Sequence, residues 1–562
     1  MINPRTRPCG EGTIRSTGHV AGFALSVKTW ALIAGILGSS TALIDESVVN
    51  VALPAIETQL NAPVAVVQWV TNAYTLCVAA LLLIGGAAGD RFGRRRILVT
   101  GIGIFAVAST WCGLAQSIPE LITARAVQGI GAALLIPCSL ALIGASFDET
   151  ERGKAIGTWS GFAALAGAVA PILGGFIVDH ASWRVIFFIN PFLALPAALI
   201  ALRFVPESRD PKAPETLDWL GTLLAFAGLG ALVAGLIWAP GLGWGDPIVV
   251  GLLSAGTVLL IAFVRHDTRT SAPLIPPALF RSRDFAGVNL LTFLLYGALG
   301  GAFFFLPFDL IQVHGYSATQ AGSAFLPFTV ILGALSRWSG GLLDRFGARL
   351  PLVTGPIITA LGFMLLAIPG PGASYWTTFF GPMVVLGLGM AISVAPLTTT
   401  VMNAVDRRHI GIASGVNDAV ATVASLLAVA VFGIVALTIS DSSLNHQLAS
   451  VQVSAEVRAA IESAKGKFVI DRALVLGQSA DRQIAVEAIR QSLAAGIRGS
   501  MLLAAALALG GALLAALTIS PKPGSTPVKP RNSDQKQPWR FNPRTGQLRR
   551  GHLPTRYRNH QP

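Results

Sequence analysis

The stretch Gly86–Arg95 reads GAAGDRFGRR, and it recurs 254 residues later as GGLLDRFGAR over Gly340–Arg349. Each copy follows an apolar run long enough to cross a bilayer, which takes about 20 residues in a helix. A motif repeated at matching places in two apolar segments indicates two related halves. The repeat therefore predicts a duplicated membrane protein in which the same charged turn follows a spanning helix twice.

The composition also predicts a membrane protein. The 562 residues are 53% hydrophobic and only 12% charged, and the mean hydropathy is +0.64. Soluble domains carry about 25% charged residues, so an ordinary soluble protein is excluded. Fourteen apolar runs have spanning length, with centres near Ile36, Leu76, Val107, Leu134, Ala166, Leu193, Leu229, Val258, Phe293, Val330, Leu361, Leu388, Ala424 and Ala508.

The spacing of the two motifs indicates how the spans are distributed. Six helices per half would separate the motifs by roughly 180 to 200 residues, which leaves room in the observed spacing for two more helices, placed between Leu217 and Val264. The predicted fold class is an all-α polytopic membrane protein with two six-helix bundles and two inserted central helices. The predicted division is an N-terminal tail (1–28), a first bundle (29–206), the inserted pair (207–266), a second bundle (267–519) with a long outer loop at 440–497, and a basic tail (520–562).

Positive charge alternates between successive short loops. Lys and Arg occupy every second loop, as Arg91 with Arg94–Arg96, Arg152 with Lys154, Arg203 with Arg209, Arg281 with Arg283, Arg345 with Arg349, and Arg407 with Arg408, whereas the opposite short loops hold almost only Arg184. By the positive-inside rule, both termini are predicted to be cytoplasmic in a bacterial inner membrane. Residues 1–26 are polar and do not resemble a cleaved signal peptide.

Two hydrophilic segments lie outside the predicted spans. The net charge is +13, but Ser520–Pro562 alone holds ten Lys and Arg against Asp534. We therefore predict a disordered tail near anionic headgroups rather than a nucleic-acid site, with a regulatory partner as the alternative. The loop 440–497 is predicted to be solvated and partly helical, with docking of an envelope adaptor as the alternative; its apolar stripe is Ile484, Ile489, Leu493 and Ile497.

The sequence offers no sign of a metal, a cofactor or ATP hydrolysis. Cys9, Cys77, Cys112 and Cys138 are scattered, and the eight histidines lie in tails, loops or span ends. Gly129–Ala133 imitates a dinucleotide fingerprint, but no strand precedes it, so the glycines indicate helix packing. Without a Walker motif, the energy for any work must come from the proton-motive force. We expect a transporter and not an enzyme.

The repeated motif itself predicts a gate. Its glycines let two helix ends approach closely, and its Asp can cap or pair with a neighbouring helix end. A plain positive-inside loop would explain the arginines but not the repeated spacing. The predicted gate residues are Gly86, Asp90, Arg91, Gly93 and Arg94 in the first copy and Asp344, Arg345 and Gly347 in the second. Because Ala348 replaces Arg94 in the second copy, we expect the first copy to be the principal gate.

Several motifs together resemble a known family. Gly86–Arg95 and Leu121–Gly129 (LITARAVQG) resemble two motifs of the major facilitator superfamily. Leu43–Pro54 (LIDESVVNVALP), Trp183-Arg184 followed by Asn190-Pro191, and Ala395–Leu397 with Gly411–Gly415 resemble fourteen-helix drug:proton antiporters of the EmrB/QacA type. The resemblance covers roughly Ile33 to Ile439. It implies alternating access, in which two bundles rock about a central site.

Three charged residues inside predicted spans are candidates for proton coupling. A charge at the bilayer centre costs about 2.5 to 3.5 kcal/mol, so such residues face a cavity or a partner. We expect Asp45 to be the coupling acid, while Glu46, about 100° further round the helix, either shares this role or lines the outer mouth. The resemblance implies a part in proton transfer for Arg125, and the alternative is an anchor that snorkels to the interface.

Other residues are candidates for packing or for a substrate cavity. Gly157, Pro171, Gly174 and Gly175 resemble the antiporter motif of the fifth helix, although Ala166 and Ala170 stand where the family usually has glycine. The proposed cavity residues are Asn50, Gln128, Asp309 and Asp418, and Phe303–Phe305 and Trp159 either add aromatic cavity surface or pack. For Asp309 and Asp418 the alternative is a solvated residue at a helix end.

These observations predict a proton-coupled exporter of amphipathic or cationic drugs. The predicted partners are a small amphipathic substrate, protons and membrane lipids; the protein is expected to be a monomer, with a periplasmic adaptor as a further candidate partner. One rival is a dedicated exporter of a single metabolite, such as a natural product, a siderophore or a lipid-like compound. The other is a non-transporting scaffold or sensor, which would have no reason to keep buried charges.

Overall fold

A computed structural model describes residues 26–210, 217–270, 273–370, 374–405, 410–449, 480–520, 539–541 and 548–550. The predicted fold class is confirmed: fourteen of its helices are long and apolar enough to cross a membrane. The exact boundaries of the predicted division stay predictions. Cys9, Arg407 and Arg408, with most of both tails and of the outer loop, lie outside the described residues.

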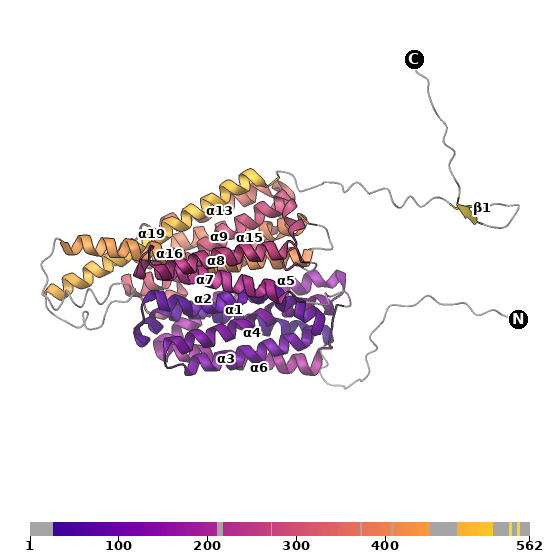
Figure 1. The fold of residues 1–562 in the computed structure, drawn as a ribbon, viewed down its shortest axis with the longest axis horizontal. Coiled ribbons are helices and arrows are strands. Elements are labelled where there is room, and N and C mark those ends of the chain that lie inside the picture. The colour runs from indigo at the N-terminus through magenta and orange to yellow at the C-terminus, as the bar shows by residue number, and fades with distance from the viewer. Residues whose placement is uncertain are drawn as a thin grey trace, which may run out of the picture.

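The first half contains six helices in a row (Figure 1). They are α1 (Val27–Leu60), α2 (Val64–Phe92), α3 (Arg94–Leu114), α4 (Ile118–Ser146), α5 (Glu149–His180) and α6 (Trp183–Phe204). The inserted pair follows as α7 (Trp219–Leu242) and α8 (Pro247–Asp267). The second half, preceded by the short helix η1 (Pro277–Arg281), comprises α9 (Arg283–Phe308), the π-helical turn η2 (Asp309–Val313), α10 (Ala318–Ser323), α11 (Leu326–Gly340), α12 (Leu342–Phe346), α13 (Arg349–Leu366), α14 (Tyr375–Thr378), α15 (Phe380–Asn403), α16 (Ile410–Ala449) and α19 (Ala480–Thr518).

The helix packing repeats between the halves. In the first half α1 packs on α5 and α6, α3 packs on α6, and α4 packs on α2 and α3. In the second half α9 packs on α16 and α19, α13 packs on α19, and α15 packs on α11 and α13. These are the same pairings in the same chain order, so the duplication indicated by the repeated motif extends to the whole bundle.

The inserted pair covers the seam between the halves. Helix α7 packs on both α2 and α16 through an apolar cluster whose members are Leu76, Leu229, Val233, Ile237, Leu426 and Ala430. Helix α8 packs on α7, and most of its residues are exposed. Because exposed apolar side chains are stable in lipid, this placement is consistent with two extra spans added to the outside of the duplicated bundle.

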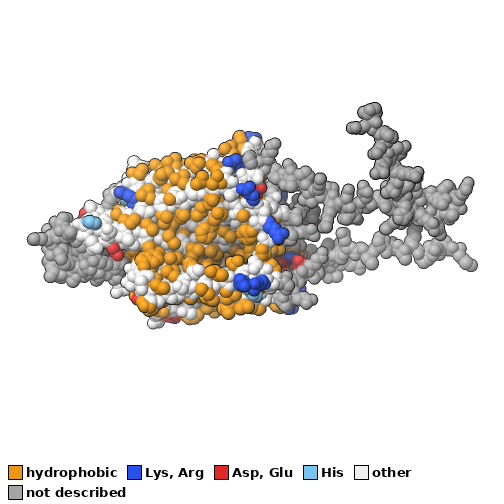
Figure 2. All heavy atoms as spheres, turned by 45° about the horizontal axis from the view of Figure 1, so that its top comes forward, with side chains coloured by type: hydrophobic (Ala, Val, Ile, Leu, Met, Phe, Trp, Pro, Cys, Tyr) orange, Lys and Arg blue, Asp and Glu red, His pale blue; other side chains and the backbone are white. Residues whose placement is uncertain are grey.

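The charged side chains are distributed unequally over the two ends. Figure 2 shows an apolar band across the visible face of the described molecule, with most of the visible Lys and Arg side chains at one end of it. We call this the basic end; it carries Arg94–Arg96 and Arg203, and the opposite end is called the far end. The first described helix begins and α19 ends at the basic end (Figure 1).

The described part of the outer loop is helical, in agreement with the partly helical segment predicted for 440–497. Helices α16 and α19 continue well beyond the bundle at the far end (Figure 1), with 40 and 39 residues. At about 1.5 Å per residue, each is far longer than the roughly 30 Å hydrocarbon core. Ile489, Leu493 and Ile497 of the predicted stripe are buried, whereas Ile484 is 43% exposed. Residues 450–479 lie outside the described residues.

Part of the basic tail departs from its prediction as a disordered segment. Strand β1 (Trp539–Phe541) pairs antiparallel with β2 (Leu548–Arg550). The sequence between the strands contains Asn542, Pro543 and Gly546, which favour turns. The rest of 521–562 lies outside the described residues.

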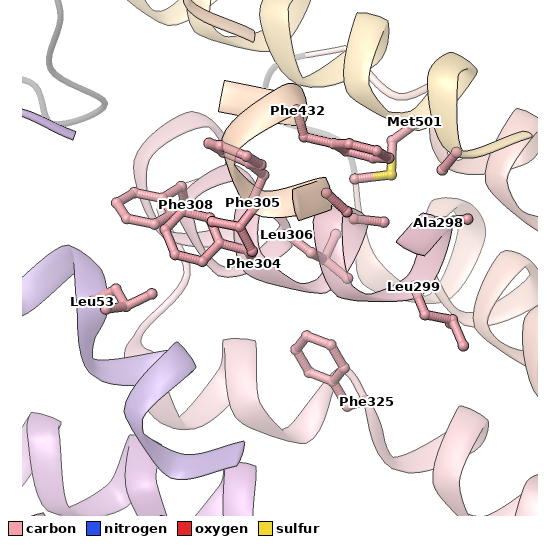
Figure 3. Close-up of a cluster of buried hydrophobic side chains, with 14 of the residues drawn as sticks. Leu53, Ala298, Leu299, Phe304, Phe305, Leu306, Phe308, Phe325, Phe432 and Met501 are labelled. Atoms are coloured by element: carbon pink, nitrogen blue, oxygen red, sulfur yellow. The ribbon is translucent and has the colours of Figure 1, made fainter. Parts of the chain in front are cut away.

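The aromatic run of α9 packs in the core. Phe304 and Phe305 are buried with Phe308, Phe432 and Met501 in one cluster (Figure 3). Phe303 is partly buried against the same core. These side chains therefore pack in the core, which is one of the two roles considered for them above.

The crossing of α3 and α4 yields a stability prediction. A Cβ atom on Gly131 would lie 2.6 Å from the backbone nitrogen of Phe105, whereas one on Gly103 would meet nothing within 4 Å. We expect Gly131→Ala to destabilise the bundle by about 1–3 kcal/mol through overpacking. The matched variant Gly103→Ala should melt at or above the wild-type temperature, as measured in detergent by tryptophan fluorescence. Equal melting of the two variants would contradict the close crossing.

Candidate functional site

The centre of the first half holds a fully buried carboxylate, that of Asp45 on α1. Its Oδ2 is paired with Nη1 of Arg125 on α4. Its Oδ1 accepts hydrogen bonds from Nε2 of Gln128 (2.9 Å) and from Nδ2 of Asn190 on α6 (2.6 Å). All three partners donate, so this arrangement suits the ionised form of the carboxyl group.

Arg125 makes further hydrogen bonds and an aromatic contact. Its Nη1 also donates to Oε1 of Gln128 at 2.6 Å, and its Nε donates to the carbonyl of Val70 at 3.0 Å. The guanidinium carbon lies 4.3 Å from the ring centroid of Tyr74, which adds a cation–π contact. The side chain is only 1% exposed, so it does not snorkel to the interface as the alternative role required.

A second layer of hydrogen bonds fixes Asn190. Its Nδ2 also donates to Oγ of Ser109 on α3 at 2.9 Å, and that hydroxyl donates to the carbonyl of Phe187 at 2.8 Å. Residues from α1, α3, α4 and α6 therefore meet in one network around Asp45. Asn190 was recognisable in the sequence only as part of a family motif, and Ser109 and Tyr74 were not predicted to take part in the site.

Small residues allow α4 to bring Arg125 to this place. A Cβ atom on Gly129, one turn after Arg125, would lie 2.5 Å from the carbonyl oxygen of Tyr74 on α2. Gly131 makes the close approach to α3 described above. The two glycines thus let α4 pack directly on two neighbours, in agreement with the helix-packing interpretation of Gly129–Ala133.

Glu46 and Asn50 lie outside the hydrogen-bond network. The side chain of Glu46 is exposed although it stands near the middle of α1, within electrostatic range of Arg125 and Asp45. Asn50 is half-buried, and its Oδ1 has no hydrogen-bond partner among the described residues. The structure therefore separates Glu46 from Asp45, its neighbour in sequence.

The two acids predicted for the second half lie apart from Asp45. Asp309 is buried in the turn η2, with its Oδ2 3.7 Å from Nε2 of His314. Burial and the nearby charge of Arg490 lower the pKa of His314 to about 4, so this imidazole is neutral at pH 7. Asp418, on α16, is exposed and lies within electrostatic range of Tyr296 on α9.

The first copy of the repeated motif forms a braced turn at the basic end. Gly93 separates α2 from α3 with a φ of +118°, a conformation that favours glycine. Asp90 pairs with Arg94, with an Nη2 to Oδ1 distance of 2.8 Å. Gly86 would place a Cβ atom 3.5 Å from Pro137 of α4, which is an ordinary contact.

Glu207, which follows α6, was not predicted to take part in this turn. Its Oε1 and Oε2 accept the backbone N–H groups of Arg95 (3.0 Å) and Arg96 (3.2 Å) at the start of α3. A Cβ atom on Gly93 would lie 2.6 Å from the carboxyl carbon of Glu207. Sequence reasoning missed this acid because the pairing joins residues more than a hundred positions apart.

The second copy has a different helix geometry. Helix α11 ends at Gly340, the short α12 carries the Asp-Arg-Phe triplet, and Gly347 has a φ of +72°. Arg345 is exposed, and the side chain of Asp344 lies outside the described residues. The glycine turn is therefore common to both copies, whereas the helix before it is continuous only in the first.

The glycines of α5 divide into two groups. Gly174 would place a Cβ atom 2.6 Å from Cγ1 of Val48 on α1, and Gly175 would place one 2.1 Å from the carbonyl oxygen of Ala318 on α10. Gly157, towards the basic end, meets nothing within 4 Å. Pro171 lies in the tightly packed part, and Trp159 donates to Oγ of Ser39 at 2.7 Å.

The family model described as Major Facilitator Superfamily matches residues 35–429. The chain belongs to the major facilitator superfamily. This family consists of membrane transporters, so the fold and the broad class of activity follow from membership.

Relatives within the superfamily include named resistance and export proteins. The chain is 35% identical over 423 residues to the tetracenomycin C resistance and export protein of Streptomyces glaucescens, covering 74% of this chain and 77% of that one. It is 32% identical to the methylenomycin A resistance protein of Bacillus subtilis, covering 75% and 90%. A cephamycin export protein of Amycolatopsis lactamdurans is 35% identical over 69% of this chain and 81% of its own.

Solved structures share the fold at low sequence identity. A bacterial homolog of the human lysosomal transporter Spinster aligns with a TM-score of 0.61 and 16% identity, covering 88% of this chain and 97% of that one. The Escherichia coli xylose transporter XylE aligns with a TM-score of 0.52 and 15% identity, covering 89% and 97%. This likeness extends over both halves of the superfamily fold.

The hydrogen bonds that Glu207 accepts from the start of α3 give a prediction for hydrogen–deuterium exchange. Replacing Glu207 by Ala removes the acceptors of the Arg95 and Arg96 amides, so we expect faster exchange in peptides covering 94–98, by roughly tenfold for a bond worth about 1.4 kcal/mol. Glu120→Ala is a matched control, because Glu120 accepts the Gln116 amide at the far end. Unchanged exchange at 94–98 in Glu207→Ala would contradict these hydrogen bonds.

Proposed function

We propose that this chain exports amphipathic, often cationic, small molecules across a bacterial inner membrane in exchange for protons. The observation that carries the proposal is the buried Asp45–Arg125 pair with its two amide donors, Gln128 and Asn190. Proton coupling needs an acid whose protonation changes the relative free energies of two conformations. Protonation of Asp45 would meet this requirement because it changes the interactions of the residues that contact the carboxyl group.

Protonation of Asp45 would remove the ionic partner of a permanently charged group. Arg125 would keep the Val70 carbonyl, the Gln128 oxygen and the rings of Tyr74 and Phe187, none of which carries a negative charge. Removing one member of a buried ion pair costs about 3–5 kcal/mol when nothing rearranges. A conformation in which α1 and α4 separate, or in which water reaches Arg125, therefore becomes favoured on protonation. In this account Arg125 acts as the sensor of the proton on Asp45.

The gradient supplies enough free energy for useful export. One proton moving through 100 mV yields about 2.3 kcal/mol. Since about 1.4 kcal/mol corresponds to a tenfold concentration ratio, a single proton supports more than a tenfold gradient of an exported neutral compound. No further energy source or cofactor is required by the proposal.

We infer that Glu46 and Asp418 face the substrate. Each is an exposed acid on a spanning helix, Glu46 on α1 of the first half and Asp418 on α16 of the second. Exposure to lipid would cost several kcal/mol, so a water-accessible space between the halves is the favourable surrounding. Two acids in such a space would attract cationic substrates, and Asn50 offers a further hydrogen-bond acceptor. Asp309 and His314 form a separate buried pair, for which we propose no substrate contact.

The proposed orientation places the basic end in the cytoplasm. The Lys and Arg side chains gather there, and the positive-inside rule assigns that end to the cytoplasmic face. We further propose that the Asp90 turn acts as the principal cytoplasmic gate and that the Asp344 turn is its weaker counterpart. The proposed working unit is a monomer, and an envelope adaptor on residues 440–497 is an additional candidate partner.

A dedicated exporter of one metabolite is the second candidate. The names of the relatives support it, because the tetracenomycin C and cephamycin proteins are each named for a single antibiotic. Both candidates use the same coupling site. They differ in substrate range, which a panel of unrelated compounds separates.

Transport by Asp45→Asn tests the proposal. Asparagine has nearly the same shape but cannot gain or lose a proton, so we expect energised uptake of a lipophilic cation into everted vesicles to fall to the level of vesicles without the protein. The matched control is Asp246→Asn, which changes an exposed capping residue before α8. Wild-type uptake by Asp45→Asn at equal expression would overturn the assignment of Asp45.

A further inference from the structure

The two halves are joined at the far end by a carboxylate that bridges them. Asp179, near the end of α5 in the first half, accepts hydrogen bonds from the start of α10 in the second half. We propose that Asp179 is a latch residue, which holds the far end closed and must release whenever this end opens. The inference rests on the proposed function only in assuming that the far end opens at all.

Three hydrogen bonds form the latch. Oδ1 of Asp179 accepts the backbone N–H of Ala318 at 2.9 Å, and Oδ2 accepts the backbone N–H of Thr319 at 2.7 Å. The Thr319 hydroxyl donates to Oδ2 at 2.5 Å. Hydrogen bonds to an ionised carboxylate are stronger than those between neutral groups. One side chain thus engages these three donors across the boundary between the halves, and the Ser317 side chain also interacts with it.

The backbones of α5 and α10 touch directly beside this carboxylate. A Cβ atom on Gly322 would lie 2.0 Å from the carbonyl oxygen of Pro171, and one on Gly175 would lie 2.1 Å from that of Ala318. No side chain can be inserted at either position without moving a backbone. The two glycines therefore let the helices approach closely enough for the carboxylate of Asp179 to reach α10.

The glycines of the same helix towards the basic end do not meet the second half. Added Cβ atoms at Gly157, Gly161 and Gly167 would meet nothing within 4 Å. Helix α5 thus contacts the second half tightly at one end and has room at the other. This asymmetry is what a rocking helix requires if the far-end contact is one of two alternatives.

Two other contacts close the far end alongside the latch. Nε2 of Gln68 on α2 donates to the carbonyl of Val429 on α16 at 3.0 Å, at the place related to α5–α10 by the repeat. Leu53 on α1 is fully buried near the aromatic cluster that includes Phe308 of α9 (Figure 3). Gln68 is buried, whereas Asp179 is exposed to water. Water can replace the bonds of an exposed carboxylate, so Asp179 is the contact best suited to repeated release.

Cysteine labelling of the full-length chain tests the latch without any substrate. Leu53→Cys serves as the reporter in a Cys9→Ser background, in lipid nanodiscs that expose both ends. Maleimide labelling of residue 53, followed by peptide mass spectrometry, measures how often the far end opens. The buried Cys77, Cys112 and Cys138 are internal standards for general unfolding.

We expect Asp179→Asn to label residue 53 about tenfold faster, which corresponds to about 1.4 kcal/mol. The amide cannot accept all three hydrogen bonds. Asp246→Asn, which changes another exposed aspartate before a helix at the far end, should label at the wild-type rate. Equal labelling of Asp179→Asn and wild type, with the internal standards unchanged, would overturn the latch.

A second pair of variants separates the latch from general loosening of α5. Gly175→Ala should also speed labelling of residue 53, whereas Gly167→Ala on the same helix should not. If both alanine variants speed labelling equally, the α5–α10 contact is not the determinant and the proposal fails. Because the readout is accessibility, loss of transport in Asp45→Asn remains an independent test of the proposed function.

Discussion

A buried carboxylate inside a membrane protein must be surrounded by donors, and this requirement organises the first half of the chain. Asp45 stands near the middle of a 34-residue helix, where neither water nor lipid headgroups reach it. Arg125, Gln128 and Asn190 supply the donors. Arg125 in turn needs acceptors, because it cannot lose its proton. The two charges therefore stabilise each other, and either one alone would be costly.

The helix packing follows from this requirement. Four helices meet at the pair, and glycines on α4 remove the side chains that would keep it from α2 and α3. The second half repeats the helix pairings, and among its described residues α9 and α16 contribute Asn289, Thr292 and Asn417 to a neutral hydrogen-bonded cluster. One half thus carries the buried ion pair that we propose to be proton-sensitive, while the other supplies a similar scaffold. The two halves contact each other through α5 with α10 and through α2 with α16.

Much of this arrangement was predictable from the sequence, for physical reasons. Hydrophobic length predicts the fourteen spans, and charges inside apolar runs single out Asp45 and Arg125, since such residues are too costly without a role. The residues that the sequence did not reveal act through long-range pairings: Asn190 on Asp45, Glu207 on the start of α3, and Asp179 on α10. The helical character of 440–497 was predicted, but not how far α16 and α19 extend, because a solvated helix and a polar loop have similar compositions.

Proton release on substrate binding tests the central claim most directly, because it measures the coupling between Asp45 and substrate in one step. Purified protein in weakly buffered detergent is mixed with tetraphenylphosphonium or another amphipathic compound whose binding is verified by calorimetry, and the pH change is recorded. The account predicts proton release from the wild type and none from Asp45→Asn, with binding retained in both. Equal release by the two proteins would show that the proton comes from another group and would contradict the account.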